Sequence, residues 1–455
     1  MALAELSVSR IEELLKNRNY ATLKAELLDM NSADVAAAID ELYSDDFDEK
    51  AEFLMLYRLL PKDTAAEVFT FMNPDMQEYL INAFSDTELR EVLSKSFIDD
   101  TVDMIEEMPA NVVGRILKNS STGARKAINE ILKYPRDSAG SIMTIEYVSI
   151  HKDMTVSEAF DKIRSVGVNK ETIYTCYVTE NRRLIGIVSV KDLFIADDDD
   201  IIGDIMETNI ISVETTEDKE NVAKMFRKYD FLAIPVVDKD YRLVGIVTFD
   251  DAMDVIEEED SEDVSKMYAM TPMEDSYFRT SVLRHAMNRI VWLLILMIGM
   301  SITGVITMNY ETAFSMMPIL VAFMPMIMDT GGNCGSQSST LIIRGMALDE
   351  IHFSDFFKVV FKEFRISIII SAILALVNGA RIYIMYGHNY TLSVAVAISI
   401  IATVIMSKLI GAMLPMLAKK CHLDPAIMAA PLLATIIDMC SVMLYFNIAS
   451  AMLGL

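Results

Sequence analysis

The stretch that most constrains this chain is a polar sequence inside a long apolar one. Residues 313–343 are mostly apolar, and this run is longer than the roughly 20 residues that a helix needs to cross a bilayer. Its middle, residues 325–337, reads PMIMDTGGNCGSQ. Polar groups and non-helical backbone persist at membrane depth only where they are buried in protein or line a water-filled path. We therefore expect a broken helix here, of the kind that forms ion or substrate sites in transport proteins.

A second polar residue, Asp438, lies near the centre of the apolar run 426–453. A carboxylate costs about 2.5–3.5 kcal/mol at the bilayer centre, so it indicates a functional site by default. The alternative is an ion pair with a neighbouring helix, for which Lys408 and Arg381 are the nearby cations in the sequence.

Asp329 and Glu311 are weaker candidates for the same site. Asp329 precedes Gly331 and Gly332, which permit positive φ and a sharp break in a helix. Its carboxylate could therefore line the path or instead hydrogen-bond the broken backbone.

Five apolar runs predict five membrane spans, at residues 290–308, 313–343, 366–386, 392–418 and 426–453. Nine Lys or Arg flank the side from which the first span starts, against Arg381 alone on the other. Cationic flanks mark the cytoplasmic side, so we expect a cell-membrane protein with its N-terminal half in the cytoplasm and its C-terminus outside. An odd number of spans leaves no inverted halves within one chain. A pore shared by two subunits on a two-fold axis is then the simplest symmetric arrangement.

Charge is divided unevenly along the chain. Residues 281–455 contain 10 Lys and Arg against 8 Asp and Glu, which leaves 30 against 58 in residues 1–280. Nucleic acid needs a cationic surface and is excluded as a partner, whereas carboxylate oxygens suit hard divalent cations. The four scattered cysteines include no CxxC pair and indicate neither disulfides nor a zinc site. The first residues, MALAE, show no cleavable signal pattern.

The acidic half predicts two architectures. Over residues 1–137 apolar residues recur every three or four positions between Pro61, Pro74 and Pro109, which predicts short helical hairpins. Residues 138–256 contain a duplication, in which each copy predicts strand, helix, strand, strand, helix. The matching pairs are SIMTIEYVSIHKDMTVSEAF (141–160) with DIMETNIISVETTEDKENVA (204–223), and LIGIVSVKDL (184–193) with LVGIVTFDDA (243–252).

A charged helix is predicted at residues 250–275, between the acidic half and the membrane half. Asp251, Asp254, Glu258 and Glu262 share one face at three- and four-residue spacing. Like charges at this spacing repel each other, so the face suits bound cations. A solvated linker is the plain alternative.

Together these motifs resemble the MgtE family of magnesium channels. The resemblance rests on DTGGNCGSQ with the following SSTLIIR, on PLLATIID at residues 431–438, and on the duplication, which is similar to a tandem CBS pair. It implies a homodimeric, multidomain membrane protein that transports Mg²⁺ and is regulated by it. CBS pairs often bind adenine nucleotides such as ATP, and which nucleotide this pair takes is open. The implied domains are an all-α N domain (1–137), an α+β tandem CBS pair (138–202 and 203–256), a connecting or plug helix (257–280) and a five-helix transmembrane pore domain (281–455).

The resemblance also implies roles for individual residues. Asp438 is the expected selectivity carboxylate and Asn333 a pore-lining amide. Cytosolic Mg²⁺ bound between the acidic domains is expected to shut the pore, and Asp99 and Asp103, one helical turn apart, can share one ion. The implied regulatory carboxylates are Asp99, Asp103, Asp218, Glu220, Asp230, Asp251, Asp254, Glu259, Glu262 and Asp263.

Three other functions are compatible with parts of the sequence. A carrier or exchanger of divalent cations such as Mg²⁺, Co²⁺ or Mn²⁺ stays open. A membrane-anchored enzyme or nucleotide sensor is disfavoured, because no nucleophile–base set and no GxxxxGK phosphate loop occur. An anion channel would offer cationic or amide-rich groups where this chain offers a carboxylate.

Overall fold

The computed structural model describes residues 2–43, 50–273, 277, 280–311, 315, 317–386, 389–428 and 430–454. The chain divides into two compact units, Met1–Ile256 and Glu257–Leu455. Ala313, where the second predicted span starts, lies outside the described residues.

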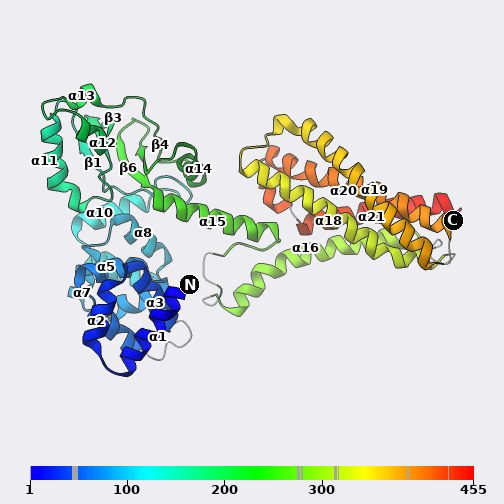
Figure 1. Cartoon of the computed structure of the whole chain (residues 1–455), viewed down its shortest axis with the longest axis horizontal. Coiled ribbons are helices and arrows are strands. Elements are labelled where there is room, and N and C mark those ends of the chain that lie inside the picture. Colours follow the sequence, from blue (N-terminus) through cyan, green and yellow to red (C-terminus); the bar gives the residue numbers. More distant parts are fainter. Residues whose placement is uncertain are drawn as a thin grey trace. The chain divides into compact units, whose positions relative to one another are not determined.

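The first part of unit Met1–Ile256 is helical throughout its described residues, which confirms the predicted all-α N domain (Figure 1). Pro61 and Pro109 directly precede helices, and Pro74 is the first residue of one, where a missing N–H is harmless. Its helices are α1 (Ala2–Lys16), α2 (Tyr20–Asp29), α3 (Ser32–Tyr43), α4 (Lys50–Leu59), α5 (Lys62–Thr70), α6 (Pro74–Ala83), α7 (Asp86–Leu93), α8 (Ile98–Glu107), α9 (Ala110–Asn119) and α10 (Thr122–Ile131).

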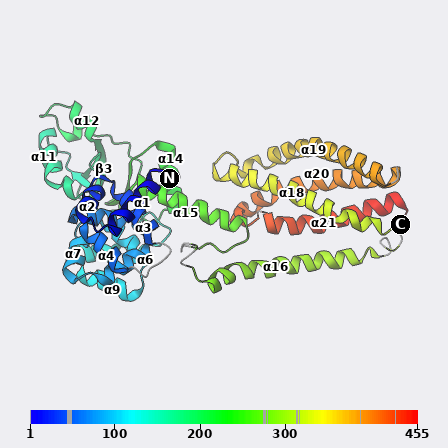
Figure 2. The ribbon, with the colours of Figure 1, turned by 60° about the horizontal axis from the view of Figure 1, so that its bottom comes forward.

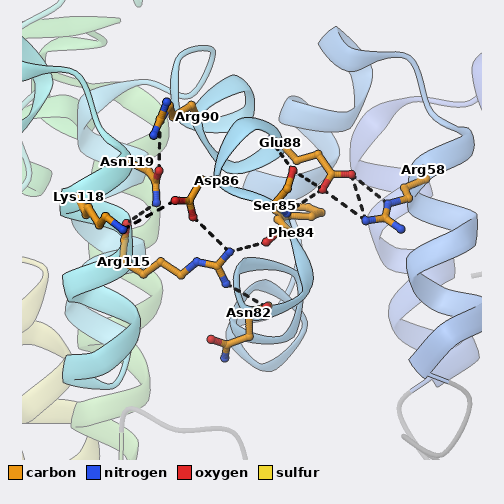
Figure 3. Close-up of polar contacts among 10 residues, drawn as sticks. All are labelled: Arg58, Asn82, Phe84, Ser85, Asp86, Glu88, Arg90, Arg115, Lys118 and Asn119. Carbon is orange, nitrogen blue, oxygen red and sulfur yellow. Dashed lines mark hydrogen bonds and ion pairs between the residues drawn. The ribbon is translucent and has the colours of Figure 1, made fainter.

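Polar side chains tie neighbouring helices of this domain together (Figure 3). Glu88 completes the capping box of α7 with Ser85 and also pairs with Arg58 of α4 at 3.1 Å. Arg115 of α9 donates a hydrogen bond to the carbonyl oxygen of Asn82 at 2.9 Å. Such exposed pairs each contribute about 0–1 kcal/mol, so the apolar core supplies most of the stability.

The duplicated region forms two three-stranded sheets of the same design, which confirms the predicted duplication and its order of strands and helices. In each sheet the first strand is parallel to the second, and the second is antiparallel to the third. Thr144, which precedes the first sheet, also pairs with Ile246 of the second. The strands are β1 (Val148–Ile150), β2 (Thr175–Glu180), β3 (Arg183–Ser189), β4 (Val213–Glu214), β5 (Ala233–Val237) and β6 (Leu243–Thr248). The helices are α11 (Val156–Val166), η2 (Gly167–Asn169), α12 (Val190–Ile195), α13 (Ile202–Ile205) and α14 (Lys219–Tyr229).

The connecting helix differs from its predicted bounds. Helix α15 (Phe249–Met267) begins directly after β6 and runs across the division between the two units at Ile256, because no helix-breaking residue interrupts it. It ends before residue 275, because Ala269 takes positive φ and the amide of Met270 bonds the Ser265 carbonyl at 2.9 Å. Residues 274–276 lie outside the described part of the chain.

Unit Glu257–Leu455 is a bundle of long helices, in which α18 packs against α20 and α21, and α19 against α20 (Figure 2). Four described helices are long and apolar enough to span a membrane: Val282–Met308, Phe353–Met385, Tyr390–Lys420 and Pro431–Leu453. Helix α18 carries the polar sequence, and its role as a fifth span stays a prediction. The elements are α16 (Val282–Met308), α18 (Ile319–Ala347), η3 (Phe353–Asp355), α19 (Phe356–Met385), α20 (Tyr390–Lys420), η4 (Pro425–Met428) and α21 (Ala430–Leu453).

The predicted break in the polar sequence is wrong. Helix α18 is continuous through Gly331 and Gly332, and the only glycine with positive φ in the described residues is Gly454. The glycines serve close packing instead. A methyl group at Gly331 would lie 2.9 Å from Ser441 Oγ, and one at Gly335 would lie 3.2 Å from the backbone oxygen of Ser407.

Candidate metal centres

The polar residues of α18 form one stripe along the helix. Asp329, Asn333 and Gln337 follow each other at four-residue spacing, which places them on one face. All three are exposed in the single chain, whereas Gly331 and Gly335, on the opposite side of the helix, are buried. The helix therefore presents carboxylate and amide groups away from its own bundle.

Asp438 approaches this stripe from the neighbouring helix α21. It is half-buried, and Asp329 lies near enough to it for the two carboxylates to repel each other. The close packing described above fixes this arrangement, because glycine leaves no side chain between α18 and the residues of α20 and α21. Carboxylate and amide oxygens are ligands that hard dications accept, directly or through their bound water. Asp438 and the polar stripe of Asp329, Asn333 and Gln337 thus form the first candidate metal centre.

A second group of carboxylates lies in unit Met1–Ile256. Asp99 belongs to the first turn of α8, Glu146 precedes β1, and Glu171 precedes β2. One carboxylate oxygen from each lies within 4.8 Å of the other two. Glu146 is oriented by the amide of Ile98, which donates to its Oε2 at 3.0 Å and so caps α8. We call Asp99, Glu146 and Glu171 the N-terminal carboxylate cluster.

Burial and mutual repulsion hold these carboxylates toward their neutral forms. Burial first, and then Asp251, Glu171 and Asp100, raise the pKa of Asp99 well above its usual range. Burial, followed by Asp100, Asp250 and other carboxylates, raises the pKa of Glu171 to about 8. Burial also raises the pKa of Asp251 to about 6, although the hydrogen bond from the Thr248 hydroxyl opposes this shift.

The chemistry of the cluster suits a hard dication. Oδ1 of Asp99 and Oε2 of Glu171 are buried and have no hydrogen-bond partner among the described residues. A buried unpartnered oxygen costs free energy, and a bound cation removes that cost. The donors are oxygens only, which favours Mg²⁺ or Ca²⁺ over zinc or copper.

The predicted ligands of the second CBS copy have structural roles in and around α14. Asp218 caps α14 by accepting from the Glu220 amide at 2.9 Å, and Glu220 pairs with Lys224 at 2.6 Å. Asp230 ends α14 in the left-handed conformation, with φ of 54°. The structure does not bring these three into the N-terminal carboxylate cluster. Asp103 is exposed on α8, outside the cluster.

On α15 the predicted residues fall into different surroundings. Asp251, in the first turn, interacts electrostatically with Asp99 of the cluster. Asp254 is exposed, and Glu259 and Asp263 are half-buried. Glu262 pairs with Lys266, whose Nζ also lies 2.7 Å from Asp424 Oδ2. A lysine ammonium thus already neutralises the Glu262 carboxylate.

Sequence reasoning missed four carboxylates around Asp99 and the third member of the α18 stripe. Asp100 and Asp250 adjoin predicted residues, but Glu146 and Glu171 lie in loops that only the tertiary fold brings to α8. Gln337 could have been predicted from the sequence, since it continues the four-residue spacing of Asp329 and Asn333.

Comparison with known proteins assigns the chain to a family. The family model MgtE, described as divalent cation transporter, matches residues 324–448. The MgtE intracellular N domain matches residues 30–137, and the CBS domain matches 139–199 and 202–258. Magnesium transporter MgtE of Thermus thermophilus is 33% identical over 99% of this chain and 99% of its own. The chain belongs to the MgtE family.

Other MgtE relatives agree with this assignment. Magnesium transporter MgtE of Enterococcus faecalis is 38% identical over 71% of each chain. The crystal structure of the cytosolic domain of the Mg²⁺ channel MgtE in complex with ATP matches with a TM-score of 0.50 and 34% identity, covering 55% of this chain and 99% of that one. The expected membership, and with it a membrane protein of a magnesium transporter family, is therefore confirmed.

Proposed function

We propose that this chain is a magnesium-selective channel for Mg²⁺ uptake, closed by cytosolic Mg²⁺. The observation that carries the proposal is the exposed polar stripe of α18 beside Asp438, in a bundle with four helices that are long and apolar enough to span a membrane. The magnesium transporters to which the chain is 32–38% identical support the choice of ion. Its uptake is transport and not an enzymatic reaction.

The same stripe supports a homodimer. Asp329, Asn333 and Gln337 are exposed in the single chain, and exposure of such groups to lipid is costly. A second copy that faces α18 across a two-fold axis removes this cost and encloses a water-filled path between two identical stripes. Two Asp438 carboxylates then lie near one axis, where they attract a hydrated dication without stripping its water.

We propose that the N-terminal carboxylate cluster, together with Asp251, regulates the channel. Carboxylates that repel one another come together at lowest cost when a dication binds between them. Mg²⁺ therefore favours the arrangement in which α8, the CBS loops and the start of α15 are in contact. A state that binds the ion more tightly is populated as the ion concentration rises. The remaining predicted carboxylates of α15, Asp254, Glu259 and Asp263, are proposed as weaker sites.

A nucleotide is proposed as a second ligand of the cytosolic unit. The matching crystal structure of a relative's cytosolic domain is a complex with ATP. We accordingly place an adenine nucleotide at the CBS pair, with the N-terminal half in the cytoplasm and the C-terminus outside.

Ion flux into proteoliposomes tests the proposed function. We expect uptake of Mg²⁺ that exceeds uptake of Ca²⁺, Mn²⁺ and Co²⁺, and that falls when Mg²⁺ is also supplied on the cytosolic side. Unitary currents in planar bilayers separate a channel from the alternative, a carrier or exchanger of divalent cations. Absence of Mg²⁺ uptake in both assays would overturn the proposal.

A further inference from the structure

A buried ion pair lies inside the membrane unit, apart from both candidate metal centres. Lys408 Nζ of α20 lies 3.8 Å from Glu363 Oε2 of α19, and their side chains are only 5% and 8% exposed. Ser338 of α18 lies between them and is fully buried. Its hydroxyl donates to Glu363 Oε2 at 2.7 Å and accepts from Lys408 Nζ at 3.1 Å.

These contacts join three helices at one point. The serine hydroxyl donates to one charged partner and accepts from the other, so its orientation is fixed. Hydrogen bonds to charged groups are shorter and stronger than those between neutral groups. Of the three helices, α18 is the one that carries the polar stripe, and Ser338 directly follows Gln337 of that stripe.

The packing of α18 explains why such a contact is needed. The face that α18 turns to α20 includes Gly335, which lies against the Ser407 backbone, and Gly411 of α20 lies against the Gly335 carbonyl. Glycine faces let helices approach closely, and side-chain hydrogen bonds then join them. At the glycine positions themselves no side chains interdigitate to resist rotation of one helix about its axis. A directional polar contact next to them adds that resistance.

Stability alone does not account for the pair. Burying two charges is expensive, and replacing a buried ion pair with apolar residues is often neutral or stabilising. We propose that Lys408 and Glu363 are positioning residues, which hold Ser338 and thereby fix the rotation of α18 so that Asp329, Asn333 and Gln337 face the ion path. The inference rests on the proposed function, because it concerns how the same path discriminates among ions.

Ser338→Ala in the full-length protein is the direct test. It removes both hydrogen bonds and adds no atoms, so the chain should still fold. We expect the ratio of Mg²⁺ to Na⁺ uptake in proteoliposomes to fall by about tenfold or more, because displacements near 1 Å at a functional site can cost as much as about 100-fold. The ratio distinguishes positioning from stability, since loss of folded protein lowers both fluxes together.

Ser399→Ala is the matched control. Ser399 is equally buried on α20, but its hydroxyl donates to the Ala395 carbonyl of its own helix at 2.8 Å. This variant should keep the wild-type ratio. A wild-type ratio in Ser338→Ala would overturn the inference.

The charged partners provide a second measurement. Glu363→Gln leaves Lys408 buried without its counter-charge and can prevent folding. The double variant Glu363→Gln/Lys408→Met removes both charges and should fold, while its Mg²⁺ to Na⁺ ratio should fall as in Ser338→Ala. A wild-type ratio in the double variant would overturn the role of the pair. Lack of Mg²⁺ uptake by the wild type would instead overturn the proposed function.

Discussion

Single carboxylates in this chain differ in what surrounds their charge. Asp438 is half-buried among apolar helices and has a second carboxylate, Asp329, nearby. Asp355 is instead paired with Lys358 at 2.8 Å, which is 84% exposed. A dication interacts strongly with the first and weakly with the second, because the lysine and the solvent screen the charge of Asp355.

Asp438→Asn should lower Mg²⁺ uptake about tenfold or more, because the amide keeps the size of the side chain and removes the charge that attracts the ion. Uptake into proteoliposomes measures the effect, and Asp355→Asn is the control that should transport normally. Wild-type uptake by Asp438→Asn would exclude this carboxylate from the ion path.

Glu171 makes the free energy of unfolding of unit Met1–Ile256 depend on pH. Its pKa is raised from 4.5 to about 8 in the folded state, so the folded unit holds a proton that the unfolded chain releases. Without metal, stability is therefore full at low pH and is lost as the pH rises from about 4.5 to about 8. Although each pKa unit corresponds to about 1.4 kcal/mol, the residue is only half-buried, and we expect a loss of about 1–2 kcal/mol.

Urea denaturation of the fragment 1–256 in EDTA across this pH range measures that loss of stability. In the Glu171→Gln variant, stability should change less with pH. Added Mg²⁺ should stabilise the wild type more at the alkaline end, because metal binding requires deprotonated carboxylates. Equal stabilisation by Mg²⁺ at every pH would argue against binding at the cluster.

At the scale of elements, what the sequence predicts is the local pattern, and what it cannot show is long-range contact. The strand and helix order of the CBS copies and the four apolar spans follow from periodicity and length. The continuity of α18 was missed because glycine permits both a break and a close approach, and only the neighbours Ser441 and Ser407 decide between them. Glu146 and Glu171 were missed for a related reason, since loops have no periodicity that indicates what they face.

Gly411→Ala tests close approach at the α18–α20 interface. The new methyl group would collide with the backbone carbonyl of Gly335, which cannot rotate away as a side chain could. We expect destabilisation of about 1–3 kcal/mol, as for other overpacked sites. Thermal unfolding in detergent measures it against Gly304→Ala of α16, where the methyl group would meet no atom within 4 Å. Equal stability of the two variants would mean that the helices can separate without cost.

Across the whole molecule, the acidic part of the chain and the apolar part have different proposed roles. The acidic residues 1–280 hold the N-terminal carboxylate cluster, whereas the remaining residues are nearly neutral and hold the helices that are apolar enough to span a membrane. Asp99 of the N domain meets Glu146 and Glu171 of the first CBS copy, so the cluster needs both domains. Loss of either domain dismantles it.

Removal of residues 1–137 should accordingly leave a protein that transports Mg²⁺ but is closed less effectively by Mg²⁺ on the cytosolic side. The measurement is uptake into proteoliposomes as the cytosolic Mg²⁺ concentration is raised. The full-length Asp99→Asn variant should shift the same curve in the same direction. Closure at wild-type concentrations in both proteins would place the sensor outside the N domain.

Because α15 is one continuous helix, an insertion or deletion within it changes the direction of every residue that follows in the helix. The helix runs without interruption from Phe249, directly after β6, to Met267, and so carries both Asp251 and Lys266. Each residue of a helix adds about 1.5 Å and about 100° of turn, so one inserted residue would rotate Lys266 and its partner Glu262 away from their original direction relative to Asp251. An insertion of seven residues, about two full turns, would nearly restore that direction and lengthen the helix by about 10 Å.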